Sequence, residues 1–439
     1  MPFLPPKISR RSILAGGAGA IAASSLPIAE LAQAQSSGQA RQDWPAVAAL
    51  IDRWVGGKRV ANMVAALGWR QQAPEYITRG TLAFDKTDQV GRDTLYRIYS
   101  MTKPITGMAA MMLVDEGKLG LDQPLAEIIP AYAEMQVQKV ADGPITADNL
   151  EPAKRPITIR HLLTHTAGLG YSIIQQGPIA QAYRANGLDP GAVSRLSIVP
   201  VFNGPKAPSL AAFAERLAKL PLIYQPGSRW SYSMSLDLMG RVIEIVSGKP
   251  FDAFLRDRIF RPCGMTSTWF QVPESERGRM TTNYFSLAGY PIPIDMGGDS
   301  IFYDKPAFPF GGAGLVSTAR DNDRFLQMLA GHGMLEGTRV MSEAAVRMGT
   351  SNLMPDTVPA GRGFREGFGF GAGGLVGQGE AEGLYGWFGA ASTAGLVNLQ
   401  WGLRQTLMTQ VLNASGQSTL QEDFPPAVAQ DAAAMLQAA

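Results

Sequence analysis

Hydrophobic residues recur along this chain with helical spacing in some stretches and with strand-like composition in others. Near the N-terminus, Asp43 stands where a helix N-cap is expected, and Gly56-Gly57 stands where a helix ends. Four apolar residues between them share one helical face: Trp44, Val47, Ile51 and Trp54. Two strand-like segments follow, at residues 60–67 and 76–84. This part of the chain therefore predicts a helix and then two strands.

The next helix is predicted near residue 100, directly after a β-branched and aromatic run at residues 95–99. Its apolar face has the spacing i, i+3, i+4, i+7, in Ile105, Met108, Ala109 and Met112. Gly117 supplies the glycine that favours a helix C-cap. Pro104 limits where this helix can begin, because proline is tolerated only in the first turn of a helix. Ser100 and Lys103 are therefore expected at the helix entrance.

Between residues 120 and 300 the pattern predicts mainly short helices joined by Pro- and Gly-rich connections. A short capped helix and turn starts at Thr158. An amphipathic helix follows at residues 236–246 and ends at Gly248.

Beyond residue 310 the pattern changes again. It predicts a helix at residues 320–329, a flexible glycine-rich loop at 367–374, strands at 393–400 and 404–412, and a closing helix at 423–437. Strands near both ends of the chain predict an α/β (α+β) fold, in which an antiparallel sheet receives a large helical insertion. We expect one catalytic unit at residues 35–439. Its α/β part would comprise 43–100 and 310–439, and its helical part 101–309.

Residues 1–34 are predicted to be an export signal. A basic start with Lys7, Arg10 and Arg11 precedes a weakly apolar core at residues 13–23, and Ala32-Gln33-Ala34 fits a cleavage site. Arg10-Arg11 resembles the twin-arginine signal; the alternative is the basic start of an ordinary secretory signal. Cleavage removes three basic residues and one acidic residue, so the mature chain is close to neutral. The expected location is periplasmic or secreted.

Composition narrows the possible functions. The 439 residues are 46% hydrophobic and carry a net charge of +2, which gives no indication of a nucleic-acid partner. No stretch after the signal is long and apolar enough to span a membrane. The single cysteine, Cys263, excludes an intrachain disulfide and is expected to be a small buried residue.

Two other motifs have weak support. His161 and His165 have a spacing that can hold zinc, but Leu162 fills the glutamate position of the usual motif, so we expect no metal and no cofactor. Glycines 369, 371 and 374 match a dinucleotide-binding pattern but lack the strand–helix frame that it needs. There is no Gly-x-Ser-x-Gly elbow, which argues against an α/β-hydrolase.

The strongest chemical candidate is Ser100 with Lys103. Residues i and i+3 share a helix face, so the amine can approach the hydroxyl and form an activated nucleophile with its base. The alternative is an N-cap serine followed by a solvated lysine. Tyr232, after a Pro-Gly turn, is a candidate helper, although an aromatic residue packing at a helix start explains it equally well.

These stretches together resemble the serine β-lactamase and penicillin-binding protein superfamily, whose mark is Ser-x-x-Lys. The greatest similarity is to the branch of class C β-lactamases, D-aminopeptidases and family VIII carboxylesterases. It extends over about residues 45–415. The stretches that carry it, besides residues 100–103, are 121–125, 160–168, 226–233 and 259–265.

The resemblance implies three motifs. Ser100 and Lys103 match the first, and Tyr232 matches the tyrosine of the second. Met234 replaces an asparagine of class C β-lactamases, and residues 387–389 (Trp-Phe-Gly) replace a lysine or histidine, threonine and glycine. Both departures remove polar groups that hold a β-lactam, and family VIII carboxylesterases are similar in having Trp-x-Gly here. The resemblance therefore implies a serine hydrolase acting on small-molecule esters.

The mechanism that the resemblance implies is acyl transfer through a Ser100 acyl-enzyme, with Lys103 and Tyr232 sharing the role of base. Which of the two accepts the proton is left open. The oxyanion would lie between the backbone N–H groups of Ser100 and Ala390. Substrate would bind at Gly389 and in an apolar pocket lined by Trp387, Phe388 and Tyr171. The alternatives are a β-lactamase or D-amino-acid peptidase, an acyltransferase, and a non-catalytic ligand-binding module.

Overall fold

A computed structural model describes the protein at residues 38–196, 204–359, 366–413 and 419–438. The predicted export signal at residues 1–34 lies outside this part of the chain. No helix within it combines the length and the apolar character that crossing a bilayer requires.

A seven-stranded antiparallel sheet forms the centre of the fold, with the strand order β11-β12-β13-β14-β15-β1-β2. The strand bounds are β1 (Asn62–Trp69), β2 (Glu75–Gly80), β11 (Phe368–Phe370), β12 (Leu375–Gly377), β13 (Leu384–Gly389), β14 (Thr393–Asn398) and β15 (Leu403–Met408). Strand β1 pairs with β15, so the two ends of the chain meet inside one sheet. The predicted antiparallel sheet built from both chain ends is therefore confirmed.

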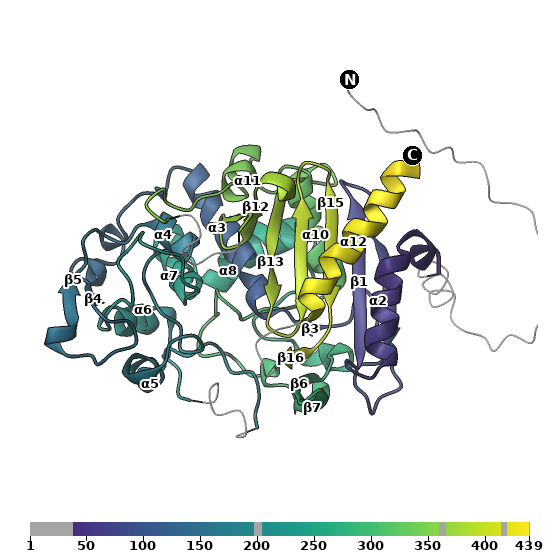
Figure 1. Cartoon of the computed structure of the whole chain (residues 1–439), viewed down its shortest axis with the longest axis horizontal. Coiled ribbons are helices and arrows are strands. Elements are labelled where there is room, and N and C mark those ends of the chain that lie inside the picture. The colour runs from purple at the N-terminus through teal and green to yellow at the C-terminus, as the bar shows by residue number, and fades with distance from the viewer. Residues whose placement is uncertain (1–37, 197–203, 360–365, 414–418, 439) are drawn as a thin grey trace, which may run out of the picture.

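Helices cover both faces of this sheet (Figure 1). Helices α2 (Pro45–Gly56) and α12 (Thr419–Ala438) pack side by side on one face, and α10 (Ala319–Ala330) packs on the other. Successive side chains of β1 alternate between the two: Met63 and Ala65 join the α2–α12 core, whereas Val64 and Ala66 join the main core. Because both faces are covered, β1 is apolar along nearly its whole length.

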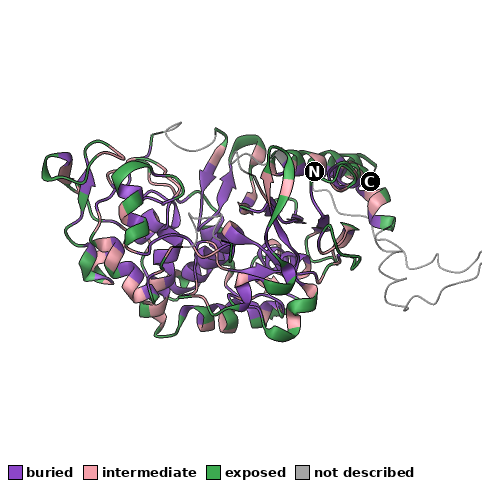
Figure 2. Cartoon of the chain, turned by 90° about the horizontal axis from the view of Figure 1, so that it is seen from below, coloured by how far each residue is buried: buried purple, intermediate pink, exposed green. Residues whose placement is uncertain are grey.

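The remaining described helices and strands build the other half of the molecule and the edges of the sheet. The helices are α3 (Thr102–Asp115), α4 (Ile159–Leu163), α5 (Gly177–Ala185), α6 (Leu210–Ala218), α7 (Ser235–Ser247), α8 (Phe251–Leu255), α9 (Arg261–Cys263) and α11 (Glu343–Gly349), with a π-helical turn at Arg256–Phe260. The strand groups are β3 (Tyr96–Arg97) with β8 (Val316–Ser317), β4 (Gln136–Gln138) with β5 (Leu150–Pro152), β9 (Met334–Leu335) with β10 (Thr338–Arg339), and β16 (Val411–Asn413) with β6 (Asn283–Leu287) and β7 (Tyr290–Asp295). Figure 2 shows that buried residues gather along the sheet and the helices packed on it.

Helix α3 lies in the interior and is buried from Thr102 to Leu113. A side chain at Gly107 would collide with the carbonyl oxygen of Ala372, and one at Gly373 would collide with the carbonyl oxygen of Lys103. The two glycines therefore let the turn after β11 approach the backbone of α3. Gly117, with φ +67°, follows the end of the helix as predicted.

Two predictions about the glycine-rich region and the closing helix are wrong in part. The sequence predicts a loop at residues 367–374, but β11 occupies three of them and β12 follows directly. A side chain at Gly369, the one glycine of β11, would collide with the Asn352 side chain, so glycine here lets another chain segment approach the strand closely. Helix α12 begins at Thr419, so Pro425-Pro426 lie inside it. Buried Leu420, Phe424 and Val428 supply the packing that outweighs the cost of the prolines.

The remaining local predictions concern helix ends and the single cysteine. Asp43 does not cap α2, because it is itself helical and accepts a hydrogen bond from Gln39 (3.0 Å). The helix at 320–329 matches α10, and Gly248 ends α7 with φ +67°. Cys263 is fully buried, as expected. The division into α/β and helical parts stays a prediction.

A buried ion pair ties the sheet to α10. Arg404 of β15 and Asp323 of α10 are both buried, with Nε–Oδ1 and Nη2–Oδ2 distances of 2.9 and 3.1 Å. Arg404 also donates to the carbonyl oxygens of Arg70 and Gln72, which join β1 to β2. Burial raises the pKa of Asp323, and the charge of Arg404 opposes that effect. The arginine therefore joins its own strand to two other segments, α10 and the connection between β1 and β2.

Arg404→Met is expected to lower the free energy of unfolding by roughly 3–5 kcal/mol, because it leaves the Asp323 carboxylate buried without its charged partner. Urea denaturation followed by circular dichroism measures this loss. The control is Arg53→Met, since Arg53 meets Asp423 on the surface at 3.4 Å and should change stability by less than about 1 kcal/mol. Equal losses in the two variants would contradict the assigned role.

Candidate active site

Ser100 lies in the 3-10 turn Tyr99–Met101, which leads directly into α3. Tyr99 adopts φ +43°, a conformation that few non-glycine residues take. Its hydroxyl accepts a hydrogen bond from Asn283 (2.8 Å), which holds the strained turn in place. Lys103 and Pro104 fall in the first turn of α3, as the sequence predicted.

The side chains of Ser100, Lys103 and Tyr232 meet at the Ser100 hydroxyl. Lys103 Nζ donates to Ser100 Oγ at 3.2 Å, and Tyr232 Oη lies 2.7 Å from the same oxygen. The Lys103 nitrogen is also 4.5 Å from the centroid of the Tyr232 ring. Two groups that can exchange a proton with the serine therefore lie within hydrogen-bond reach of it.

Lys103 is fully buried, and the loop before β8 fixes its direction. Its Nζ donates to the carbonyl oxygen of Gly312 at 2.6 Å, and the N–H of Gly312 donates to Asp237 Oδ1 at 2.8 Å. A side chain at Gly312 would lie 2.7 Å from Asp237 Oδ2, so only glycine fits here. Burial raises the pKa of Asp237, whereas the charge of Lys103 and the bond from Gly312 lower it. The lysine is thus held by a chain of contacts that ends on α7.

Tyr232 stands in a group of aromatic rings. Trp387 stacks on it at 5.9 Å between ring centroids, and the indole Nε1 donates to Tyr232 Oη at 3.4 Å. The other rings around Tyr232 are His165 at 4.9 Å, Tyr171 at 5.7 Å and Trp230 at 6.1 Å. These contacts leave the phenol ring little freedom, so its oxygen is held against Ser100.

The two neighbouring histidines have structural contacts. His165 is buried, and its Nδ1 accepts a hydrogen bond from the Ser233 N–H at 3.2 Å. Burial, with the nearby charge of Lys103, lowers its pKa well below the ordinary value. His161 Nδ1 accepts from the Thr158 N–H at 3.1 Å and forms a capping box at the start of α4. In the described part of the chain, no three His, Cys, Asp or Glu residues come together as a metal site.

The third motif lies on β13, and its residues face in different directions. Trp387 faces Tyr232, but Phe388 packs against the core formed with α2 and α12 on the other face of the sheet. The predicted place of Phe388 in the pocket wall is therefore wrong, because adjacent strand residues point to opposite faces. A side chain at Gly389 would collide with the carbonyl oxygen of Ile98. The end of β13 thus lies against the turn that carries Ser100.

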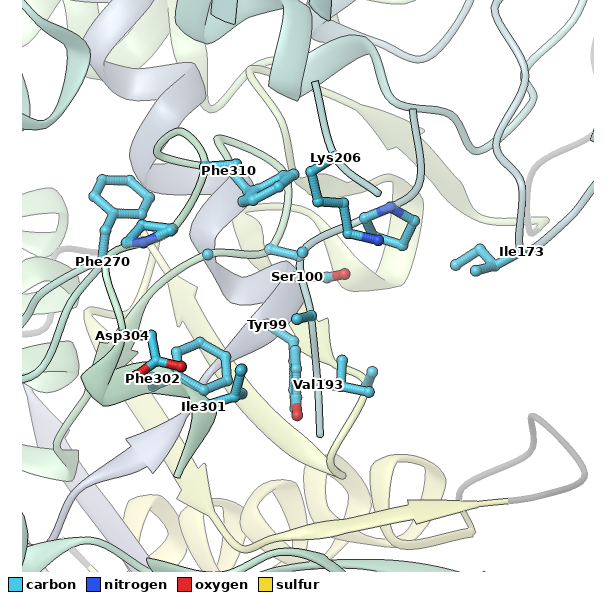
Figure 3. Close-up of a pocket in the computed structure, with 18 of the residues that line it drawn as sticks. Tyr99, Ser100, Ile173, Val193, Lys206, Phe270, Ile301, Phe302, Asp304 and Phe310 are labelled. Carbon is cyan, nitrogen blue, oxygen red and sulfur yellow. The ribbon is translucent and has the colours of Figure 1, made fainter. Parts of the chain in front are cut away.

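A cavity of about 290 Å³ opens beside Ser100 (Figure 3). Ser100 and Ala390 both line it, which places the two predicted oxyanion donors at one cavity. Tyr171 lines it as expected, whereas Trp387 does not. Most of the wall is apolar, and its large apolar side chains include Val193, Phe270, Phe302, Phe310 and Leu412.

Residues 31–419 match the family model described as Beta-lactamase. The chain belongs to the beta-lactamase family. Protein Rv1367c of Mycobacterium tuberculosis (strain ATCC 25618 / H37Rv) is 39% identical over 265 residues, which are 60% of this chain and 61% of that protein. The chain thus spans about three fifths of the length of that relative.

Esterase EstB of Burkholderia gladioli is 30% identical over 313 residues, covering 68% of this chain and 73% of EstB. The solved structure of EstCE1, described as a hydrolase with promiscuous acyltransferase activity, superposes with a TM-score of 0.70. The superposition covers 91% of this chain and 99% of EstCE1, and the two sequences are 24% identical, which shows a shared fold.

Two residues of this site are not predicted from the sequence: Gly312 and Asp237. Gly312 lies in a stretch for which the sequence predicts no helix or strand, and Asp237 lies within the amphipathic helix predicted at residues 236–246. Asp237 stands in the first turn of α7, where an acidic residue is common for reasons of helix stability alone. The sequence therefore held no signal that separated its contact with Gly312 from an ordinary helix-start carboxylate.

His161→Gln is expected to make stability less dependent on pH. Burial, with Arg155 nearby, lowers the pKa of His161 from 6.5 to about 4, so the unfolded chain takes up this proton first as the pH falls. The wild type should therefore lose about 3 kcal/mol of unfolding free energy through this group between pH 6.5 and pH 4. Urea denaturation across this range measures the slope.

Glutamine can keep the hydrogen bond at the helix start, so His161→Gln should fold and show a shallower slope. The exposed, non-ionisable Trp401 supplies the control, and Trp401→Phe should follow the wild-type slope. Parallel slopes for wild type and His161→Gln would refute the assignment.

Proposed function

We propose that the protein is a serine hydrolase that cleaves carboxylic esters of small molecules through an acyl-enzyme on Ser100. The observation that carries this proposal is the meeting of Lys103 and Tyr232 at the Ser100 hydroxyl, at 3.2 and 2.7 Å, beside an apolar cavity. Membership of the beta-lactamase family and the 30% identity with a relative named Esterase EstB support it.

The first step forms the acyl-enzyme. Ser100 Oγ attacks the ester carbonyl carbon while the Lys103–Tyr232 pair takes the hydroxyl proton. The oxyanion is stabilised by the backbone N–H groups of Ser100 and Ala390, and by the field at the start of α3. The carbon–oxygen bond to the alcohol then breaks, and the pair returns the proton to the departing oxygen.

The second step releases the acid. A water molecule attacks the acyl carbon, and the Lys103–Tyr232 pair takes one of its protons. The bond to Ser100 Oγ breaks, and the pair returns the proton to the serine, which restores the starting state. Strong fixation of Lys103 by Gly312, and of Tyr232 by Trp387, keeps both groups in reach throughout.

The environment of the site favours esters over β-lactams. Met234 is buried, and Trp387 occupies the third-motif position beside Tyr232. Neither side chain offers the amide or hydroxyl groups with which a β-lactam amide and carboxylate would be held. The apolar wall of the cavity suits the hydrocarbon part of an ester.

Ser100→Ala is expected to lower kcat for p-nitrophenyl butyrate by roughly 10⁴–10⁶-fold and to abolish labelling by a fluorophosphonate probe, because the nucleophile is removed.

Tyr232→Phe should lower kcat by about 10²–10⁴-fold with little change in KM, because it removes part of the base. Tyr290→Phe is the control, since Tyr290 is 73% exposed on β7. Steady-state kinetics and mass spectrometry supply the readouts.

A substrate panel separates this proposal from its competitors. The wild type should hydrolyse p-nitrophenyl acetate to octanoate far faster than nitrocefin, and the reverse order would assign a β-lactamase. Acyl transfer to an added alcohol that outpaces hydrolysis would assign an acyltransferase. Full activity in Ser100→Ala, or the absence of any covalent adduct in the wild type, would leave a non-catalytic binding module.

We also propose that residues 1–34 direct export by the twin-arginine route. The support is the basic pair Arg10-Arg11 and a chain whose single cysteine requires no oxidising compartment for folding. Replacing both arginines by lysine should retain at least nine tenths of the protein in the cytoplasm as precursor, by cell fractionation and immunoblotting. Unchanged export of that variant would assign an ordinary secretory signal.

A further inference from the structure

A second cavity adjoins the cavity beside Ser100. The cavity beside Ser100 has a volume of about 290 Å³, and the second has a volume of about 760 Å³. Among the described residues, four line both of them: Phe270, Lys305, Pro306 and Ala307. A residue that lines two cavities lies between them, so these four form a common wall.

Phe270 closes the inner part of this wall. It is the buried member of the four, whereas Lys305 and Ala307 are exposed and Pro306 is half-buried. Figure 3 shows Phe270 on one side of Ser100 and Ile173 on the other, so the ring lies at one end of the Ser100 cavity. The interior boundary between the two cavities is therefore an aromatic side chain.

The Phe270 ring is held in place from several directions. The preceding residue, Trp269, exchanges two backbone hydrogen bonds with Val316 of β8, at 3.0 and 2.9 Å. A side chain at Gly314 would lie 2.8 Å from the Cδ1 atom of Phe270, so the loop before β8 passes directly against the ring. Phe251 of α8 packs against it at 5.7 Å between ring centroids. The ring has little room to turn, and it forms a fixed end of the cavity.

The volume of the Ser100 cavity limits what it can hold. A methylene group takes about the space of one water molecule, roughly 30 Å³. The cavity therefore holds on the order of ten non-hydrogen atoms. After allowance for the ester group itself, about six to eight carbons remain for a hydrocarbon chain. The apolar wall suits such a chain.

We propose that Phe270 sets the upper length of the hydrocarbon chain in the ester substrate, because it closes the Ser100 cavity against the second cavity. The inference rests on the proposed ester hydrolysis and names its substrate class: esters whose chain has at most about eight carbons. A longer chain has to displace a packed ring, and such overpacking is unfavourable. The competing explanation is that Phe270 serves only as packing within the fold, and that residues 305–307 alone separate the cavities.

The test measures kcat/KM for p-nitrophenyl esters from butyrate to dodecanoate, at concentrations below those at which they aggregate. In the wild type, kcat/KM should rise to about octanoate and fall at decanoate. In Phe270→Ala, the ratio of kcat/KM for decanoate to that for butyrate should rise by about tenfold to a hundredfold. The reason is that the vacated space accepts two further methylene groups, each worth up to about fourfold in binding. Phe270→Leu should show a smaller rise.

The matched control is Phe260→Ala. Phe260 is buried and lines the second cavity but not the first, so this variant loses a ring of the same size without opening the Ser100 cavity. Its decanoate-to-butyrate ratio should stay within about threefold of the wild type. An equal rise in Phe260→Ala would overturn the proposal.

A second series lengthens the alcohol instead, from butyl acetate to decyl acetate, with the released acid followed by titration. A selective gain for long chains in either series of Phe270→Ala supports the proposal and tells which side of the ester faces the ring. Unchanged ratios in both series, or a loss of activity that is equal at every length, would overturn it.

A binding measurement separates this proposal from the hydrolysis on which it rests. Titration calorimetry of the Ser100→Ala protein compares hexanoate, octanoate and decanoate, and affinity should rise to octanoate and no further. With Phe270→Ala added, decanoate should bind about tenfold more tightly than octanoate. If this holds while no ester is cleaved, only the hydrolase proposal fails; if esters are cleaved and neither series changes, only the Phe270 proposal fails. Thermal denaturation checks the folding of each variant, and Phe270→Leu replaces Phe270→Ala if the latter is unfolded.

Discussion

The burial of Lys103 is the constraint on which the rest of the site depends. A cationic group taken out of water is costly unless nearby groups compensate it. Here the compensation comes from the Gly312 carbonyl oxygen, the Ser100 hydroxyl and the face of the Tyr232 ring. The carboxylate of Asp237 adds an opposing charge behind them. These partners belong to three segments of the chain, namely the Ser100 turn, residues 232–237 and the loop before β8, so the lysine is satisfied only when all three are in place.

Glycines make that convergence possible. At Gly107, Gly312, Gly373 and Gly389, a side chain would run into the backbone or a carboxylate of a neighbouring segment. Each position brings two elements closer than ordinary side chains permit: α3 to the turn after β11, the loop before β8 to α7, and β13 to the Ser100 turn. The rigidity of the site therefore comes from backbone approach as much as from hydrogen bonds.

The sequence was sufficient where one periodicity or one local motif decides the structure. The existence of α3, the ends of α7 and the first-turn position of Lys103 follow from spacing and from Pro104, and the structure shows all of them, although α3 is buried on every side and not on one face alone. The sequence did not predict features that depend on contacts between segments far apart in the chain. Gly369 of β11 lies where the Asn352 side chain approaches, and Phe388 packs against the core under α2 and α12, which only the folded sheet places on that face. The contact between Asp237 and Gly312 joins residues far apart in sequence, and no local pattern encodes it.

The pairing of β1 with β15 also affects when the site can assemble during protein synthesis. Ser100 and Lys103 leave the ribosome well before Ala390 and the strands β13 to β15, which follow them much later in the sequence. A nascent chain that lacks β13 to β15 has the serine but neither the opposite wall of its site nor the strand that pairs with β1. Contacts this distant in sequence form slowly. The fold therefore delays assembly of the reactive centre until β13 to β15 have been synthesised, so that a nascent chain without them presents an ordinary serine.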